Sequence, residues 1–220
     1  MLKKYHVCVA LLLLLSLSLA AKINADTVPL ASSGTAIDSG QSNSSGNTIA
    51  VAPNPAWAAP LSGSSWVSFG LTGDPSTPGF FVVPNGTIVS FLDVFNISGT
   101  PTGGTISVMA DDSATVILNG VTLMAEGSMA GNTYATCSDF GIGCLVPTII
   151  NLPTSALQTG SNTLEFDVAQ RAGSSFGLDY SGSVSDTLST PEPASALLLG
   201  IGLLVVAVFV TQRKSLIVQR

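Results

Sequence analysis

The stretch between residues 26 and 190 contains no lysine and no histidine, and Arg171 is its only basic residue. The same stretch carries twelve acidic residues. Binding of nucleic acid and attachment to anionic membrane surfaces both require clustered cations. This composition therefore excludes both modes of binding for the central part of the chain.

The missing side chains also exclude most hydrolytic active sites. Ser-His-Asp and Cys-His designs need an imidazole as proton acceptor, and a Ser-Lys dyad needs an amine. Zinc sites built on histidine are excluded, and two cysteines are too few for a site built on cysteine alone. Among common hydrolytic designs only a carboxylate pair of the glycosidase type survives.

Cysteine is scarce as well. Outside the first 25 residues, only Cys137 and Cys144 remain. An even pair at short spacing in an exported chain indicates a disulfide, and two free buried thiols are the alternative.

The chain ends in a long apolar run. Pro191-Glu192-Pro193 precedes residues 194–210, which carry no charge, and Arg213 and Lys214 follow. A helix of this length spans roughly 25 Å, which is the short end of a membrane crossing. Because basic flanks stay cytoplasmic, we expect a transmembrane helix at 194–210, a cytoplasmic tail at 215–220, and the preceding residues outside the inner membrane.

The opposite end has the pattern of a secretory signal. Lys3 and Lys4 precede an apolar stretch at residues 7–19, and small residues follow. We therefore assign residues 1–25 to a signal peptide, with cleavage after Ala20 or Ala25.

The order of Pro-Glu-Pro, apolar helix and basic cluster at 191–214 resembles the PEP-CTERM sorting signal of exopolysaccharide-producing Gram-negative bacteria. The resemblance implies that an integral-membrane exosortase recognises Pro191-Glu192-Pro193 and processes the tail. It implies partners in the inner membrane and in exopolysaccharide, and a final location at the cell surface or outside the cell. An ordinary single-pass anchor after a Pro-rich linker is the alternative.

Period-two alternation of apolar residues dominates the region between the two ends. It predicts half-buried strands at residues 105–110, 163–168 and 176–180, and the longer apolar segment 87–97 fits a central strand. Asn119-Gly120 between apolar segments predicts a two-residue hairpin. Many short strands with Gly-rich turns indicate an all-β, antiparallel β-sandwich.

This sandwich is expected to cover residues 53–184. Residues 26–52 are rich in Ser, Gly and Asn and indicate an exposed segment, with one edge strand around residues 48–51. Residues 181–190 are expected to form a tether, of which 185–190 is the linker to the sorting signal.

A second resemblance rests on the order of several segments in this region. Asp111-Asp112 precedes a strand that ends in Leu-Asn-Gly, and Gly160 and Asn162 open a later strand, with residues 53–69 upstream. This order is similar to the galactose-binding-domain-like jelly rolls of bacterial surface proteins. The resemblance implies a jelly-roll fold and no particular ligand.

Three residues are candidates for ligand binding. Asp111 and Asp112 lie between two strands, where aspartates commonly hold a turn, and calcium coordination is the alternative function. Trp66 fits a core position, and core burial is also the main interpretation of Trp57. Because Trp57 lies in a Pro-rich loop, stacking of its ring on a sugar is the alternative. We expect no catalytic residues and no cofactor other than this calcium.

These observations favour a non-enzymatic, exported surface or matrix protein that contacts polysaccharide. Most carboxylates, such as Glu165, Asp167 and Asp179, fall on strand positions expected to point outward, where they make poor general acids. The alternatives are a carboxylate-based carbohydrate-active enzyme on the same sandwich, and an ice- or surface-adhering protein. The last would need a regular threonine array, whereas threonine is scattered here.

The sorting signal generates the first prediction. Replacing Pro191-Glu192-Pro193 by three alanines should leave an unprocessed, membrane-held form, because the processing enzyme no longer recognises its substrate. Immunoblotting of fractionated cells measures the two forms. Normal processing of the triple-alanine variant would contradict the assignment.

Overall fold

Alternating apolar and polar side chains build two packed β-sheets between residues 25 and 188. The computed structural model describes residues 23–34, 38–39, 46–127, 137, 141–171, 173–189, 200–204 and 206–207. Its elements are, in chain order, β1 (Ile23–Ala31), β2 (Asp38–Ser39), β3 (Gly46–Asn47), β4 (Ile49–Ala50), β5 (Val67–Ser68), β6 (Ile88–Ile97), β7 (Thr100–Asp111), β8 (Ser113–Leu118), β9 (Val121–Met124), β10 (Thr148–Leu152), the 3₁₀ helix η1 (Thr154–Ala156), β11 (Gly160–Ala169) and β12 (Gly177–Ser189).

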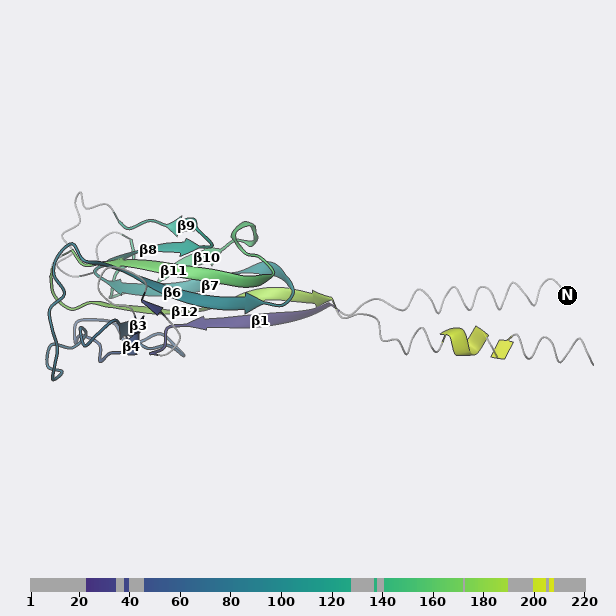
Figure 1. The fold of residues 1–220 in the computed structure, drawn as a ribbon, viewed down its shortest axis with the longest axis horizontal. Coiled ribbons are helices and arrows are strands. Elements are labelled where there is room, and N and C mark those ends of the chain that lie inside the picture. Colours follow the sequence, from purple (N-terminus) through teal and green to yellow (C-terminus); the bar gives the residue numbers. More distant parts are fainter. Residues whose placement is uncertain are drawn as a thin grey trace, which may run out of the picture. The chain divides into compact units, whose positions relative to one another are not determined.

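The strands form two sheets, which we name sheet A and sheet B (Figure 1). Sheet A has the order β10-β7-β12-β5-β4, and β1 also pairs with β12. Sheet B has the order β3-β2-β6-β11-β8-β9. The strand pairs resolved residue by residue are antiparallel, so the expectation of an all-β antiparallel sandwich is confirmed.

The core lies between the sheets and is built from the inward-facing rows of their longest strands. Leu164, Phe166 and Val168 of β11 are fully buried, as are Leu178 and Tyr180 of β12. The rings of Phe166 and Tyr180 stack across the sandwich with centroids 4.5 Å apart. Full burial of each such side chain contributes about 1.5–3 kcal/mol to the free energy of unfolding. These two rows therefore hold the sheets together by hydrophobic packing.

One polar contact crosses this apolar interior. The Tyr180 hydroxyl of sheet A donates a hydrogen bond of 2.7 Å to Oδ2 of Asp93 on sheet B. Burial raises the pKa of Asp93, and the hydrogen bond from Tyr180 opposes that rise. Burial and the neighbouring Asp93 also raise the pKa of Tyr180, so the hydroxyl remains a donor.

Several strand predictions are confirmed. The alternation at residues 163–168 lies in β11, and the segment 87–97 contains β6, which lies inside sheet B between β2 and β11. Asn119 and Gly120 both adopt positive φ, at 50° and 80°, and join β8 to β9 as a tight hairpin. The expected edge strand near residue 50 is β4, at the edge of sheet A.

Two segments predicted to be irregular are strands. Few of their own residues have a strong strand preference, and backbone hydrogen bonds to neighbouring strands stabilise them. Residues 27–31, assigned to an exposed segment, belong to β1 and bring buried Leu30 against the core. Residues 181–189, assigned to a tether and linker, belong to β12 and pair with β7 as far as Thr187. The sandwich therefore extends beyond residues 53–184 at both ends.

The two ends of the chain are described only in part. Residues 1–22, Pro191-Glu192-Pro193, Arg213 and Lys214 lie outside the described residues, so the signal peptide and the sorting signal remain predictions. Residues 200–204 and 206–207 are helical. Within the described part of the chain, no helix has the length and apolar character needed to cross a membrane.

Cys137 and Cys144 form a disulfide, as predicted, with their Cα atoms 5.3 Å apart. The Cys144 N–H also donates a hydrogen bond of 2.7 Å to the Cys137 carbonyl, so the same two residues are joined by a backbone hydrogen bond as well as by the disulfide. Both cysteines are buried against Trp57, Trp66 and Met109.

Loss of this disulfide should destabilise the sandwich. The double variant Cys137→Ser/Cys144→Ser should lose about 2 kcal/mol of unfolding free energy, because closing a short loop restricts the unfolded chain. Urea denaturation of the full chain in detergent measures the loss, and reductant should shift the wild type equally. An unchanged midpoint after reduction, with bond cleavage verified by intact mass, would contradict this expectation.

Candidate functional site

A loop covers part of the outer face of sheet A. Val108 of β7 pairs with Tyr180 of β12, and both face the core. The neighbouring pair, Met109 and Asp179, therefore faces outward. Residues 52–66, which we name the covering loop, lie over this part of the sheet, because Trp57 and Trp66 pack on Met109 and on the disulfide. A second, smaller apolar cluster therefore forms outside the sandwich.

Trp57 is the centre of the covering loop. Its side chain is only 8% exposed, and its ring lies 4.4 Å from that of Trp66, centroid to centroid. Its indole N–H donates a hydrogen bond of 2.7 Å to Oδ2 of Asp111. A Cβ atom on Gly177 would lie 2.8 Å from the Trp57 ring, so only glycine leaves room for the indole on β12.

These contacts change the interpretation of two candidate residues. The structure brings Trp57 and Asp111 together, but it buries both, with Asp111 only 5% exposed. The hydrogen bond from Trp57 to Asp111 and the packing of the Trp57 ring on Trp66 hold the loop on the sheet. In this arrangement Trp57 presents no open face for stacking on a sugar, and Trp66 occupies a core position as expected.

A second carboxylate anchors the other end of the covering loop. Asp179 is completely buried and accepts hydrogen bonds from Ser32 Oγ, Ser64 Oγ and the Leu61 N–H, at 2.9, 2.5 and 2.8 Å. The expectation that Asp179 points into solvent is wrong. Its strand position is on the outer face of the sheet, as the alternation indicated, but the covering loop shields that face from water.

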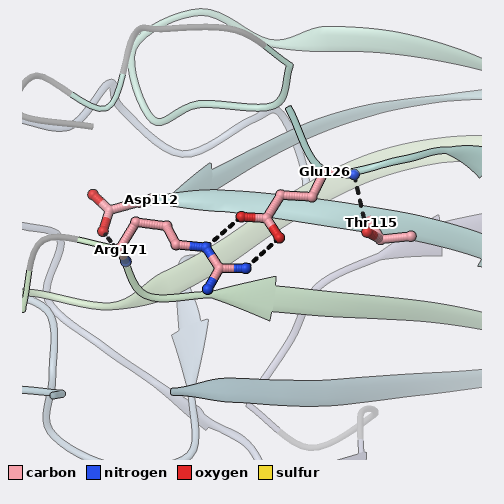
Figure 2. Close-up of polar contacts among 4 residues, drawn as sticks. All are labelled: Asp112, Thr115, Glu126 and Arg171. Carbon is pink, nitrogen blue, oxygen red and sulfur yellow. Dashed lines mark hydrogen bonds and ion pairs between the residues drawn. The ribbon is translucent and has the colours of Figure 1, made fainter. Parts of the chain in front are cut away.

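Asp112 has a different role from its neighbour. Its Oδ2 accepts a hydrogen bond of 2.8 Å from the Arg171 N–H, at the point where the chain leaves β11. The Arg171 guanidinium faces Glu126, with Nε–Oε1 and Nη2–Oε2 distances of 2.5 Å, and the Glu126 N–H donates to Thr115 Oγ1 (Figure 2). The sole arginine of this domain is thus held in a bidentate ion pair.

The Asp111-Asp112 pair has the electrostatics of a buried dicarboxylate. Burial raises the pKa of Asp111 to about 8, and Asp112 adds to the rise through a hydrogen bond and through charge repulsion. The hydrogen bond from Trp57 opposes it. At neutral pH Asp111 is therefore mainly protonated, which allows two adjacent carboxyl groups to remain buried.

A calcium site is not assembled at this pair. One oxygen of each carboxyl group already accepts a hydrogen bond. Within the described residues, His, Cys, Asp and Glu side chains do not gather in groups of three or more that could hold a metal ion. Asp111 instead holds the covering loop through Trp57, and Asp112 holds the backbone at Arg171, after β11.

Another part of the outer face of sheet A is open and hollow. A depression of about 540 Å³ lies over the start of β7, the end of β10 and the middle of β12. We name it the hydroxyl groove; it is lined by Thr102, Gly103, Gly104, Thr105, Leu152, Pro153, Thr154, Ser183 and Ser185.

Two glycines form the floor of the hydroxyl groove. Gly103 has φ of 113°, a conformation that side chains rarely adopt, and a Cβ on Gly104 would lie 2.2 Å from the Ser183 carbonyl oxygen. Any larger residue at Gly104 would push β7 away from β12. Gly104 therefore allows close pairing of β7 with β12, and Gly103 adds no side chain to the hollow.

The hydroxyl groups around this floor are available for binding. The side chains of Thr105, Ser183 and Ser185 make no hydrogen bond to any described residue, whereas the buried hydroxyls of Ser32 and Thr72 are all bonded internally. Thr102 donates to the Ser185 carbonyl and keeps its acceptor lone pairs. The groove thus offers neutral donors and acceptors in close spacing.

A second hollow of about 380 Å³ has a different character. It lies between β9 and β10 and is lined mainly by apolar side chains, among them Leu123, Met124 and Ile149. No carboxylate lines either of these two hollows of the described chain. Glu165 and Asp167 lie elsewhere, partly exposed on the outer face of sheet B.

Sequence reasoning missed the hydroxyl groove. Its β12 residues were assigned to the tether, and its glycine floor appears in the sequence only as Thr-Gly-Gly-Thr at residues 102–105. The signal that could have found it is the alternation of Ser181, Ser183 and Ser185 with other residues, which is the period of a strand with one hydroxyl-bearing face.

No protein-family model matches the chain, and no curated protein matches it. Among solved structures, it is similar to an α-L-rhamnosidase of Streptomyces avermitilis, with 20% identity, a TM-score of 0.42, and coverage of 61% of this chain and 12% of that one. A family 35 carbohydrate-binding module from Clostridium thermocellum aligns over 71% of this chain and 97% of its own, with 13% identity and a TM-score of 0.38.

A third similar structure is the carbohydrate-binding module CBM36 in complex with calcium and xylotriose. It has 8% identity, a TM-score of 0.33, and coverage of 73% of this chain and 99% of that one. At these TM-scores the similarities assign neither a fold family nor a ligand to this chain.

The buried dicarboxylate makes stability depend on pH. The folded state raises the pKa of Asp111 from 3.8 to about 8, so this group stabilises the fold fully below about pH 4, and the contribution is lost as the pH rises through about 8. The melting temperature should therefore fall between about pH 5 and pH 9. Differential scanning fluorimetry across this range measures the fall.

Asp111→Asn should remove much of this dependence. An amide can still accept from Trp57, and its NH₂ can donate to Asp112 as the protonated carboxyl does. Asp26→Asn, at an exposed aspartate of β1, is the matched control and should keep the wild-type profile. A variant Asp111→Asn with an unchanged pH slope would show that another group is responsible.

Proposed function

We propose that this chain is an exported, non-enzymatic surface or matrix protein that binds polysaccharide in the hydroxyl groove. One observation carries the proposal: Ser and Thr hydroxyls that make no hydrogen bond to the described residues surround a hollow lined by two glycines. A volume of several hundred Å³ is typical of pockets that take small molecules or short segments of polymers.

The groups in the groove match the chemistry of sugars. A sugar ring presents closely spaced hydroxyls that both donate and accept hydrogen bonds. Serine and threonine hydroxyls can do the same by rotating about the C–O bond. Gly103 and Gly104 also line the groove, and each can offer only backbone atoms to a ligand.

The location of the carboxylates supports a binding role over catalysis. A glycosidase needs two carboxyl groups roughly 5–10 Å apart across a cleft. The two hollows described here have no carboxylate lining, and the adjacent pair Asp111-Asp112 is buried beneath the covering loop. A carbohydrate-active enzyme remains the second candidate. Its carboxyl pair would be Glu165 and Asp167, which interact with each other on the outer face of sheet B, outside both hollows.

Export is supported by the signal pattern at residues 1–25 and by the Cys137–Cys144 disulfide, since disulfides persist in oxidising compartments. The sorting tail at residues 191–214 would first hold the domain outside the inner membrane. An exosortase-type enzyme would then release it to the cell surface or matrix. The jelly-roll, galactose-binding-like classification belongs to this proposal as well.

A bulky side chain placed in the hydroxyl groove tests whether polysaccharide binds there. Ser183→Tyr places a large ring in the hollow and should weaken binding of the full chain, in detergent, to immobilised polysaccharide by about tenfold or more, because two or three hydrogen bonds are lost. Biolayer interferometry measures the affinity. Ser161→Tyr, on the exposed face of β11, is the matched control and should bind normally.

Wild-type binding that survives Ser183→Tyr would place the site elsewhere. A second measurement separates binding from catalysis. Release of reducing ends from the bound polysaccharide, abolished by Glu165→Gln or Asp167→Asn, would replace the binding role by the enzyme alternative.

A further inference from the structure

We infer that the hydroxyl groove takes an uncharged polysaccharide and rejects polymers of uronic acids. This inference rests on the proposed function, because it names the ligand class of the same groove. It is supported by the distribution of charge between residues 26 and 190 and by the ion pair that Arg171 forms with Glu126.

None of the groups that line the groove carries a charge. The lining consists of Thr, Ser, Gly, Leu and Pro residues. A hydroxyl can donate one hydrogen bond to a carboxylate, but it supplies no positive charge to replace the water that an anion loses on binding. Recognition of carboxylates in proteins therefore commonly uses the guanidinium of arginine or other charged donors.

The one arginine of the domain is not available for this purpose. Arg171 lies at the end of β11, and Glu126 holds its guanidinium through two hydrogen bonds of 2.5 Å (Figure 2). The two side chains are 17% and 20% exposed, so the pair is largely shielded. A uronate would have to displace Glu126 to reach this charge.

The surrounding field opposes an anionic polymer. Between residues 26 and 190 the chain carries twelve acidic groups against a single arginine, and no lysine. At physiological ionic strength the Debye length is about 8 Å, so a polyuronate that follows the groove would meet this negative field only partly screened. A neutral glycan meets no such cost.

Calcium offers no evident way around this repulsion. Cation-bridged binding of a uronate needs a set of protein oxygens beside the groove. The described residues hold no group of three or more acidic, histidine or cysteine side chains that could bind a metal ion. The carboxyl group of Asp179, on the same strand as Ser183, is completely buried and committed to Ser32, Ser64 and Leu61.

The groove also lacks an aromatic platform. Both tryptophans are buried under or within the covering loop, at 8% and 0% exposure, and none of the lining residues is aromatic. Hydrogen bonds must then carry the affinity. Binding should leave the tryptophan emission maximum unchanged, which distinguishes this site from one built around Trp57.

The experiment compares two sets of immobilised polymers. The full chain in detergent is tested by biolayer interferometry against neutral dextran, galactomannan and mixed-linkage β-glucan, and against alginate and polygalacturonate. We expect binding to at least one neutral polymer, with less than about a twofold change in affinity between about 50 and 500 mM NaCl, over which the Debye length falls roughly threefold. Ser183→Tyr should abolish it, and Ser161→Tyr should not.

Two results would overturn the inference while leaving the proposed function intact. They are binding of a uronate polymer that Ser183→Tyr abolishes, and uronate binding that appears only with added calcium and is lost in Ser183→Tyr. Three results would instead contradict the proposed function itself: absence of binding to every polymer, binding that Ser183→Tyr does not affect, and a shift of tryptophan emission on saturation with a neutral glycan.

Discussion

The arrangement of sheet A depends on the contact between Trp57 and Gly177. An indole ring lies directly on a strand at this point, because β12 carries a glycine where any other residue would collide with it. The ring is then fixed in orientation by its hydrogen bond to Asp111. Met109, Trp66 and the disulfide pack around it and form an apolar cluster on the outer side of the sheet.

This contact divides one sheet face into two regions with different physical properties. Under the covering loop, carboxylates are dry and bonded to neutral donors, and apolar side chains exclude water. Beyond the loop, the same two strands carry hydroxyls in water over a glycine floor. The Ser181 hydroxyl donates to the Ser62 carbonyl at the boundary and so defines where one region ends. The part of sheet A under the covering loop is thus closely packed, and the hydroxyl groove lies next to it on the same two strands.

Much of the sandwich could be predicted because strand formation leaves a local pattern. The alternation in β11 and the Asn119-Gly120 turn are both contained within a few neighbouring residues. Residues 181–189 could not be recognised in the same way, because Ser, Gly and Thr have weak strand preference and β7 supplies the pairing. The tether prediction failed for that reason.

The candidate site was harder to predict than the fold. The sequence places Asp179 on the face opposite to Tyr180, and that is correct. Whether this face meets water depends on the covering loop, which is distant in the sequence and held by Gly177 and Asp111. Trp57 lies in the Pro-rich loop as predicted, and its burial there depends on the same distant contacts. The residues that line the hydroxyl groove lie partly on β12, in a segment predicted to be a tether.

The place of β12 in sheet A has a mechanical consequence. β12 is the last strand of the described residues before the predicted sorting signal at 191–214, and it lies between β7 on one side and β5 and β1 on the other. Its ladder with β7 runs over residues 177–187. Tension applied from a C-terminal anchor would act along β12 and perpendicular to its hydrogen bonds, so that the whole ladder shares the load instead of opening one bond at a time. A domain tethered by such an interior strand resists detachment by flow better than one tethered by an edge strand of the same stability.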